Sequence, residues 1–261
     1  MGEGRAPLHF WETGEGPPLV LVHGGLSNGL LAWSRTAEAL SAYHRLIVVD
    51  RRGHGKSPRL PRPYTIASDA RDLVQLAAAL GLERLHLAGH SYGALVAYEM
   101  AVRTPQAVAS LHLIEPPMLT IAADVPEVQA LIRRSLDLWR EAGRLRSEEL
   151  AARFLAMVAG EAFVQQVRTR PVWSELVAEA GRLPYEENPA AYMPPAFTAA
   201  NFRFPVRVYR GGRSHPALRI VAERLAHWIP GARLIHVPEA YHEVHKSGAP
   251  FEEALLHVTR G

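Results

Sequence analysis

Short, largely apolar runs that each end at a glycine or a polar residue recur along the chain, and they constrain the fold most. These runs are 18–22, 46–49, 85–88, 111–114, 205–209 and 232–237. Apolar runs of this length are typical of strands that are buried on both faces of a parallel sheet. Because stretches with helical periodicity, such as 67–80 and 95–103, lie between them, the pattern predicts a doubly wound α/β fold. Ser68 or Asp69 is the expected N-cap of the first of these helices, and Gly81 its end.

The pattern changes after Pro116 and Pro117. Residues 126–182 show only helical periodicity, and strand signals resume near 205. We therefore expect an α/β core formed by 1–117 and 200–261, with a helical cap inserted at 118–199.

Composition excludes several function classes. The 261 residues are 48% hydrophobic and carry a net charge of only +3, with basic residues scattered among acids, so we expect a globular protein without a nucleic-acid partner. The absence of cysteine excludes disulfides, a cysteine nucleophile and thiolate metal sites. The chain has no recognisable signal peptide and no apolar run of about 20 residues that would span a membrane, which predicts a cytoplasmic location. The oligomeric state stays open, with a homodimer among the options.

Residues 89–93 read Gly-His-Ser-Tyr-Gly, a G-x-S-x-G motif that follows an apolar run and opens a helical stretch. That context predicts a sharp turn that presents Ser91 as a nucleophile at the carboxyl end of the sheet. The glycines fit because bulky side chains at those positions would crowd the turn. The alternative interpretation is a serine in an ordinary glycine-rich turn.

Two further segments carry residues that acyl-transfer chemistry needs. Residues 23–26 read His-Gly-Gly-Leu after the first long apolar run, so the backbone N–H of Gly25 or Leu26 is a candidate oxyanion donor. Tyr92, directly after the serine, is the candidate second donor, although the glycines alone would also suit a plain turn.

His242 is the candidate general base, since it lies between the last strand signal and a C-terminal helix that starts near residue 249. His242 and His245 miss the H-E-x-x-H zinc spacing by one residue, so His245 is interpreted as a pocket or surface histidine. We expect no metal and no organic cofactor. The aromatic residues of the insertion suit either a pocket lining or simple packing; they are Trp139, Phe154, Phe163, Trp173 and Tyr192.

Together these motifs resemble the α/β-hydrolase superfamily over nearly the whole chain. The segment 50–57, Asp-Arg-Arg-Gly-His-Gly-Lys-Ser, resembles the structural D-x-R-G-x-G-x-S turn of that family. The resemblance implies an eight-stranded, mostly parallel sheet with a helical cap after strand six. Ser91 stands where haloalkane dehalogenases and epoxide hydrolases carry aspartate, which sets the chain apart from those branches.

The third member of the expected triad departs from the family pattern. The resemblance places an aspartate a few residues after strand seven, but His215 stands there and no carboxylate lies between Asn201 and Ala222. Glu115, at the end of the preceding strand, is the best replacement, since some family branches draw their acid from that position. The alternative is that Glu115 only caps the turn at 116–117 or pairs with an arginine.

The resulting prediction is a serine hydrolase that cleaves a carboxylic ester, or a related acyl bond, of a small and largely apolar substrate. Lactones, thioesters and carbon–carbon bonds remain open as substrates. The alternatives are a cofactor-free lyase or perhydrolase on the same triad, and a ligand-binding homologue with little turnover.

Overall fold

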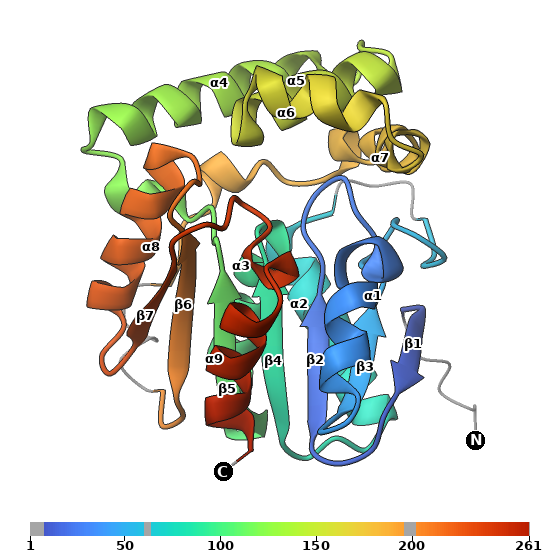
Figure 1. Cartoon of the computed structure of the whole chain (residues 1–261), viewed down its shortest axis with the longest axis vertical. Helices are drawn as coiled ribbons and strands as arrows, with labels where there is room; N and C mark the ends of the chain where they lie inside the picture. The colour runs from blue at the N-terminus through green and yellow to red at the C-terminus, as the bar shows by residue number, and fades with distance from the viewer. Residues whose placement is uncertain (1–7, 60–63, 196–201, 261) are drawn as a thin grey trace.

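A seven-stranded sheet forms the centre of the computed structural model, which describes residues 8–59, 64–195 and 202–260 (Figure 1). The strand order is β1-β3-β2-β4-β5-β6-β7, and every neighbouring pair is parallel except β1 with β3. The strands are β1 Phe10–Thr13, β2 Pro18–Val22, β3 Arg45–Val49, β4 Leu85–His90, β5 Val108–Ile114, β6 Val206–Gly211 and β7 Arg233–Val237. The expected α/β architecture is confirmed.

The expected number of eight strands is wrong for the described part of the chain, whose sheet has seven. The antiparallel β1 occupies one edge of the sheet, and the described chain begins only two residues before it, at Leu8. At the other edge, β7 is followed by a loop and the final helix, which leaves no strand to add there.

Helices cover both faces of the sheet because adjacent residues of each strand point to opposite sides. On β2, Leu19 and Leu21 belong to the buried cluster on the side of α1 and α9, whereas Val20 and Val22 belong to the cluster on the side of α2, α3 and α8. The bounds are α1 Gly29–Leu40, α2 Ile66–Ala79, α3 Tyr92–Arg103, α8 Pro216–Trp228 and α9 Ala249–Thr259. The strands are therefore buried on both faces, which explains their continuous apolar sequences.

The start of α2 differs from the sequence expectation. Thr65, and neither Ser68 nor Asp69, is the N-cap: its hydroxyl accepts from the Ser68 amide at 3.0 Å, and the Ser68 hydroxyl accepts from the Thr65 amide at 2.9 Å. This reciprocal capping box satisfies two backbone donors, so the helix begins one residue before the predicted range.

The insertion consists mainly of four helices, α4 Pro126–Ala142, α5 Ser147–Ala159, α6 Glu161–Arg168 and α7 Val172–Ala180. Figure 1 shows them lying across one end of the sheet, above the loops that follow β2 and β4. Helical structure in this region agrees with the sequence, while the division into core and cap stays a prediction. Within the described ranges, no helix combines the length and the apolar character that crossing a membrane requires.

A row of buried polar side chains crosses the sheet and makes stability depend on pH. His86 bonds the Ser110 hydroxyl at 2.8 Å, and His112 bonds Ser110 at 2.9 Å and the Tyr209 hydroxyl at 2.7 Å. Burial, aided by His44 and Arg84, lowers the pKa of His86 to about 4. As the pH falls below about 6.5, His86 is therefore protonated in the unfolded chain before it is protonated in the folded protein. This protonation stabilises the unfolded chain relative to the folded state.

We accordingly expect the folded protein to lose stability between pH 6.5 and pH 4, and the His86→Gln variant to lose less. Glutamine keeps a neutral hydrogen-bonding group but cannot be protonated, so the difference should be on the order of 2 kcal/mol. Urea unfolding of both proteins at pH 7 and pH 4.5 measures it. Parallel losses in the two proteins would contradict the assignment to His86.

Candidate active site

Ser91 lies at the junction of β4 and α3 in a strained backbone conformation, with φ 52° and ψ −121°. Such a conformation is rare for a residue with a side chain and persists only where its surroundings enforce it. The flanking glycines are part of those surroundings. A Cβ on Gly89 would lie 2.2 Å from the Gly93 carbonyl oxygen, and one on Gly93 would lie 2.4 Å from that of His23. The turn predicted from the motif is therefore present, with Ser91 bordering a cavity.

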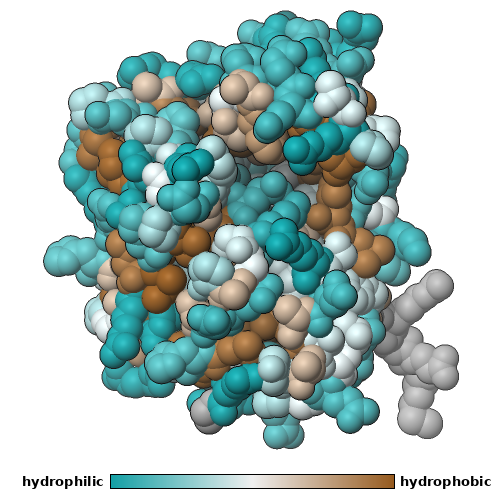
Figure 2. All heavy atoms as spheres, in the orientation of Figure 1, coloured by the Kyte–Doolittle hydropathy of each residue, from teal (hydrophilic) through white to brown (hydrophobic). Residues whose placement is uncertain are grey.

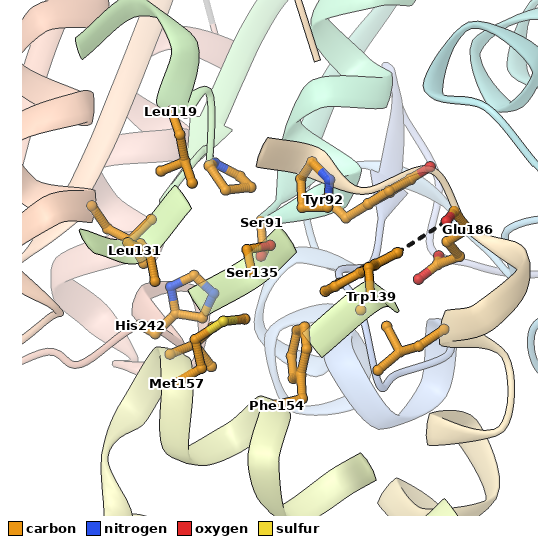
Figure 3. A pocket seen from close by; sticks show the side chains of 16 residues that line it. Ser91, Tyr92, Leu119, Leu131, Ser135, Trp139, Phe154, Met157, Glu186 and His242 are labelled. Carbon is orange, nitrogen blue, oxygen red and sulfur yellow. Dashed lines mark hydrogen bonds between the residues drawn. The ribbon is translucent and has the colours of Figure 1, made fainter. Parts of the chain in front are cut away.

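His242 lies in the loop between β7 and α9 and borders the same cavity as Ser91 (Figure 3). His90 fixes this loop, because its Nε2–H donates to the backbone carbonyl of His242 at 3.0 Å. The His90 ring lies 4.8 Å from the His242 ring and 4.2 Å from the buried His245 ring. Burial holds the pKa of His90 well below its usual value, so it remains a neutral hydrogen-bond donor to the loop.

Glu115 reaches His242 from the end of β5. Its Oε2 lies 3.2 Å from the His242 Nδ1, and its Oε1 accepts from the Gly211 amide at 2.6 Å. The side chain is fully buried, and the backbone has the left-handed φ of 50°. Because β5 and β6 are adjacent, a residue just past β5 lies beside Gly211 at the end of β6, and the loop between β7 and α9 brings His242 to the same carboxylate. In the described part of the chain no arginine pairs with Glu115, in contrast to the alternative interpretation.

His215, at the expected position of the acid, has a different task. It is the N-cap of α8, and its Nδ1 accepts from the Ala217 amide at 3.2 Å. Burial and the nearby charges of Arg134 and His242 lower its pKa, which keeps Nδ1 available as an acceptor. His215 therefore stands at the position of the expected aspartate, but it caps α8 and does not bond to His242.

The candidate oxyanion donors surround Ser91. Gly25 lines the cavity, Leu26 adopts a left-handed φ of 49°, and Tyr92 is the first residue of α3, where helix amides lack intrahelical carbonyl partners. Arg51 holds this loop in place, since its guanidinium donates to the carbonyls of His23 and Gly24 at 3.0 and 3.1 Å. These bonds hold the loop in the conformation that faces Ser91.

Two cavities meet at Ser91 and His242. The smaller lies under α4 and α5, and most of its lining is apolar, as Leu119, Leu131 and Met157 illustrate (Figure 3). The larger extends toward α6, α7 and the loop of His242. Residues of α1 and α7 line this second cavity, among them Leu31 and Leu176, and Figure 2 shows hydrophobic atoms at the surface in this region.

The aromatic residues of the insertion divide between the two cavities and packing. Trp139 and Phe154 line the smaller cavity, and Phe154 and Phe163 line the larger. Trp173 and Tyr192 line neither: Trp173 stacks under Arg168, and the hydroxyl of Tyr192 donates to Glu99. His245 also lines the larger cavity, in agreement with its interpretation as a pocket histidine.

A buried ionic cluster joins the insertion to the loop that carries Arg51. The guanidinium of Arg51 lies 2.6 Å from Glu186 and 3.1 Å from Asp69, and His54 lies 3.0 Å from both Glu179 and Glu186. Arg51 and His54 belong to the D-x-R-G-x-G-x-S segment, but no motif marks the two glutamates. Among the described residues, no group of three or more histidine or acidic side chains is arranged to hold a metal ion.

Comparison with known proteins agrees with this geometry. The family model of the alpha/beta hydrolase fold matches residues 17–249. The chain belongs to this family. The resemblance seen in the motifs is therefore confirmed over most of the length of this α/β hydrolase.

Individual relatives resemble parts or all of this α/β hydrolase. A protein of Azorhizobium caulinodans named "Putative carbamate hydrolase RutD" is 36% identical over 111 residues, which is 42% of this chain and 42% of that protein. The match thus spans less than half of the curated relative. A hydrolase from Pseudomonas aeruginosa has a TM-score of 0.75 and 25% identity, covering 96% of this chain and 93% of that one. An alpha/beta hydrolase from Sphaerobacter thermophilus has a TM-score of 0.72 and 27% identity, covering 96% and 95%.

Proposed function

We propose that this α/β hydrolase cleaves a carboxylic ester, or a related acyl bond, of a small and largely apolar substrate through an acyl-enzyme on Ser91. The observation that carries the proposal is the 3.2 Å approach of the Glu115 carboxylate to Nδ1 of His242, beside a strained serine that borders the same cavity. Serine, histidine and a carboxylate in this relation are the parts of a catalytic triad.

In the proposed reaction, the Ser91 hydroxyl attacks the substrate carbonyl carbon while Nε2 of His242 takes up its proton. Glu115 accepts the Nδ1–H of His242, which fixes the tautomer and stabilises the imidazolium that forms. The oxyanion is bound by the amides of Tyr92 and of Gly25 or Leu26. The bond to the leaving group then breaks, and His242 returns the proton to the departing oxygen. Water repeats the sequence on the acyl-enzyme and releases the acid.

The lining of the smaller cavity supports a largely apolar substrate, because a desolvated wall of this kind gives little compensation to a charged group. The carbamate in the printed name of the Azorhizobium relative is an acyl derivative that the same attack on a carbonyl carbon would cleave. We therefore place carbamates beside carboxylic esters in the substrate range to be tested.

Covalent labelling tests the proposal. We expect an organophosphonate to add one adduct to the folded protein, and the labelled peptide to contain Ser91 when the product is analysed by mass spectrometry. A phosphonate mimics the tetrahedral intermediate, so it needs the nucleophile and the base in working geometry. The absence of an adduct would favour a ligand-binding homologue, and cyanohydrin cleavage without ester turnover would favour a lyase.

A further inference from the structure

Glu186 is a buried carboxylate in the wall of the smaller cavity, and only one of its two oxygens is bonded. Its Oε1 lies 2.6 Å from the Arg51 guanidinium and 3.0 Å from Nε2 of His54. Its Oε2 is buried and has no hydrogen-bond partner in the part of the chain that the structure describes. The side chain as a whole is only 1% exposed. A buried acceptor without a partner is costly, so this oxygen needs an explanation.

Glu186 is ionised at neutral pH. Burial by itself would raise its pKa, but the charges of Arg51 and His54 outweigh that effect and lower the pKa to about 2. Asp69, the other carboxylate beside Arg51, behaves differently, because burial raises its pKa to about 7. Glu186 is therefore the main counterion of Arg51, and its second oxygen is a charged acceptor without a hydrogen-bond partner among the described residues.

A second unpartnered polar atom lies beside the same charges. The hydroxyl of Tyr92 is buried, and within the described residues it has no hydrogen-bond partner. The ring of Tyr92 packs under the Arg51 guanidinium at 4.3 Å and also lines the cavity. In Figure 3 the Tyr92 side chain extends toward the side of the cavity where Glu186 lies, away from His242. Burial raises the pKa of this phenol, so it stays neutral.

Attachment of the insertion to the Arg51 loop explains the position of Glu186 Oε1, but it does not explain the unpartnered Glu186 Oε2 and Tyr92 hydroxyl. The bonds of Oε1 to Arg51 and His54, and the 3.1 Å bond from the Trp139 indole to the Glu186 backbone carbonyl, all serve to attach the insertion. None of these bonds uses Oε2 or the Tyr92 hydroxyl. Both atoms are buried without a partner among the described residues, and both of their residues belong to the lining of a largely apolar cavity.

We propose that Glu186 Oε2, together with the Tyr92 hydroxyl, forms a polar subsite that binds a neutral hydrogen-bond donor, above all a hydroxyl group, on the far end of the substrate. This inference rests on the proposed function, since it places the reacting carbonyl at Ser91. A neutral donor fits better than an ammonium group, because Arg51 already balances the carboxylate and the apolar walls would desolvate a cation without compensation. The subsite makes the enzyme selective for hydroxylated over purely aliphatic chains.

Matched esters test the subsite. Methyl esters of straight-chain acids of five to eight carbons are compared in pairs, one ending in a hydroxyl and the other in a methyl group of similar size. We expect the wild-type protein to prefer the hydroxyl member, in kcat/KM, at the chain length that reaches Glu186. Glu186→Gln should lower that preference about tenfold, because its amide oxygen is drawn to Arg51 and its NH₂ group, a donor, then faces the cavity.

Glu179→Gln is the matched control. It removes the other glutamate of the ionic cluster, which also binds His54 but lines neither cavity, so the hydroxyl preference should stay unchanged. Equal kcat/KM ratios in wild type and Glu186→Gln would overturn the proposal. Should Glu186→Gln fail to fold, the wild-type ratios decide, because a preference for the methyl member at every length excludes the subsite.

The subsite can be tested even if the proposed hydrolase function is wrong. If neither ester turns over and Ser91 takes no phosphonate label, the proposed function fails. Calorimetric titration of the same ester pairs then tests the subsite alone. Tighter binding of the hydroxyl member that is lost in Glu186→Gln supports it, and equal binding of both members overturns it.

Discussion

Replacing Glu115 by glutamine should lower kcat for ester hydrolysis by about 10⁴-fold while leaving the fold intact. The amide keeps the shape and can still accept from the Gly211 amide, but it brings no charge to stabilise the imidazolium of His242. It can also offer its NH₂ group to Nδ1 and so hold the wrong tautomer of the ring. Steady-state kinetics of the purified variant, with its thermal unfolding midpoint as a check on folding, measures the effect.

His215→Asn is the control for this prediction. Asparagine can still cap α8, so this variant should retain activity within about tenfold if His215 serves only as a helix cap. A large loss of kcat in His215→Asn together with near-normal turnover in Glu115→Gln would overturn the assignment of the acid. If Glu115 is the triad acid, only Glu115→Gln loses most of its kcat. If His215 is the acid, only His215→Asn does.

The Ser91→Ala variant should lose about 10⁶-fold in kcat, the largest effect expected of any single substitution. Removal of the hydroxyl abolishes the acyl-enzyme, and only activity from the oxyanion donors and from substrate binding remains. Pre-steady-state assays with a chromogenic ester in excess would show no burst, and the phosphonate adduct would disappear.

Ser135→Ala provides the comparison for Ser91→Ala. Ser135 lines the same cavity (Figure 3), but it lies in the regular helix α4. Its hydroxyl donates to the side-chain oxygen of Asn188 at 2.8 Å. We expect its loss to change kcat less than tenfold. Comparable losses in both serine variants would mean that the cavity, and not a nucleophile at position 91, limits the reaction.

Local sequence was sufficient for most of the sheet and for the turn at Ser91. The ends of β2 and β3 agree with the predicted runs to within one residue, because buried parallel strands need continuous apolar side chains. Other helix boundaries differ from the predicted ones. Thr65 starts α2 through a capping box, and α3 begins directly after Ser91, earlier than the apolar periodicity indicated.

The polar parts of the candidate site were harder to predict. Glu115 was one of two interpretations, since sequence cannot show which strand lies beside another. Glu186 carries no motif, and its role depends on Arg51, a residue 135 positions earlier in the chain. Contacts between distant carboxylates and cations leave no periodic pattern, whereas burial of apolar faces does.

The sequence alone therefore determined the α/β class, the helical character of the insertion and the strained turn at Ser91, because these follow from side-chain periodicity and glycine spacing within short segments. Only the tertiary structure decided that Glu115 and not His215 approaches His242, because that depends on the loop between β7 and α9 folding back to the end of β5. It alone also brought Glu186 to the cavity wall, since the insertion must fold back onto the Arg51 loop before the two charges meet.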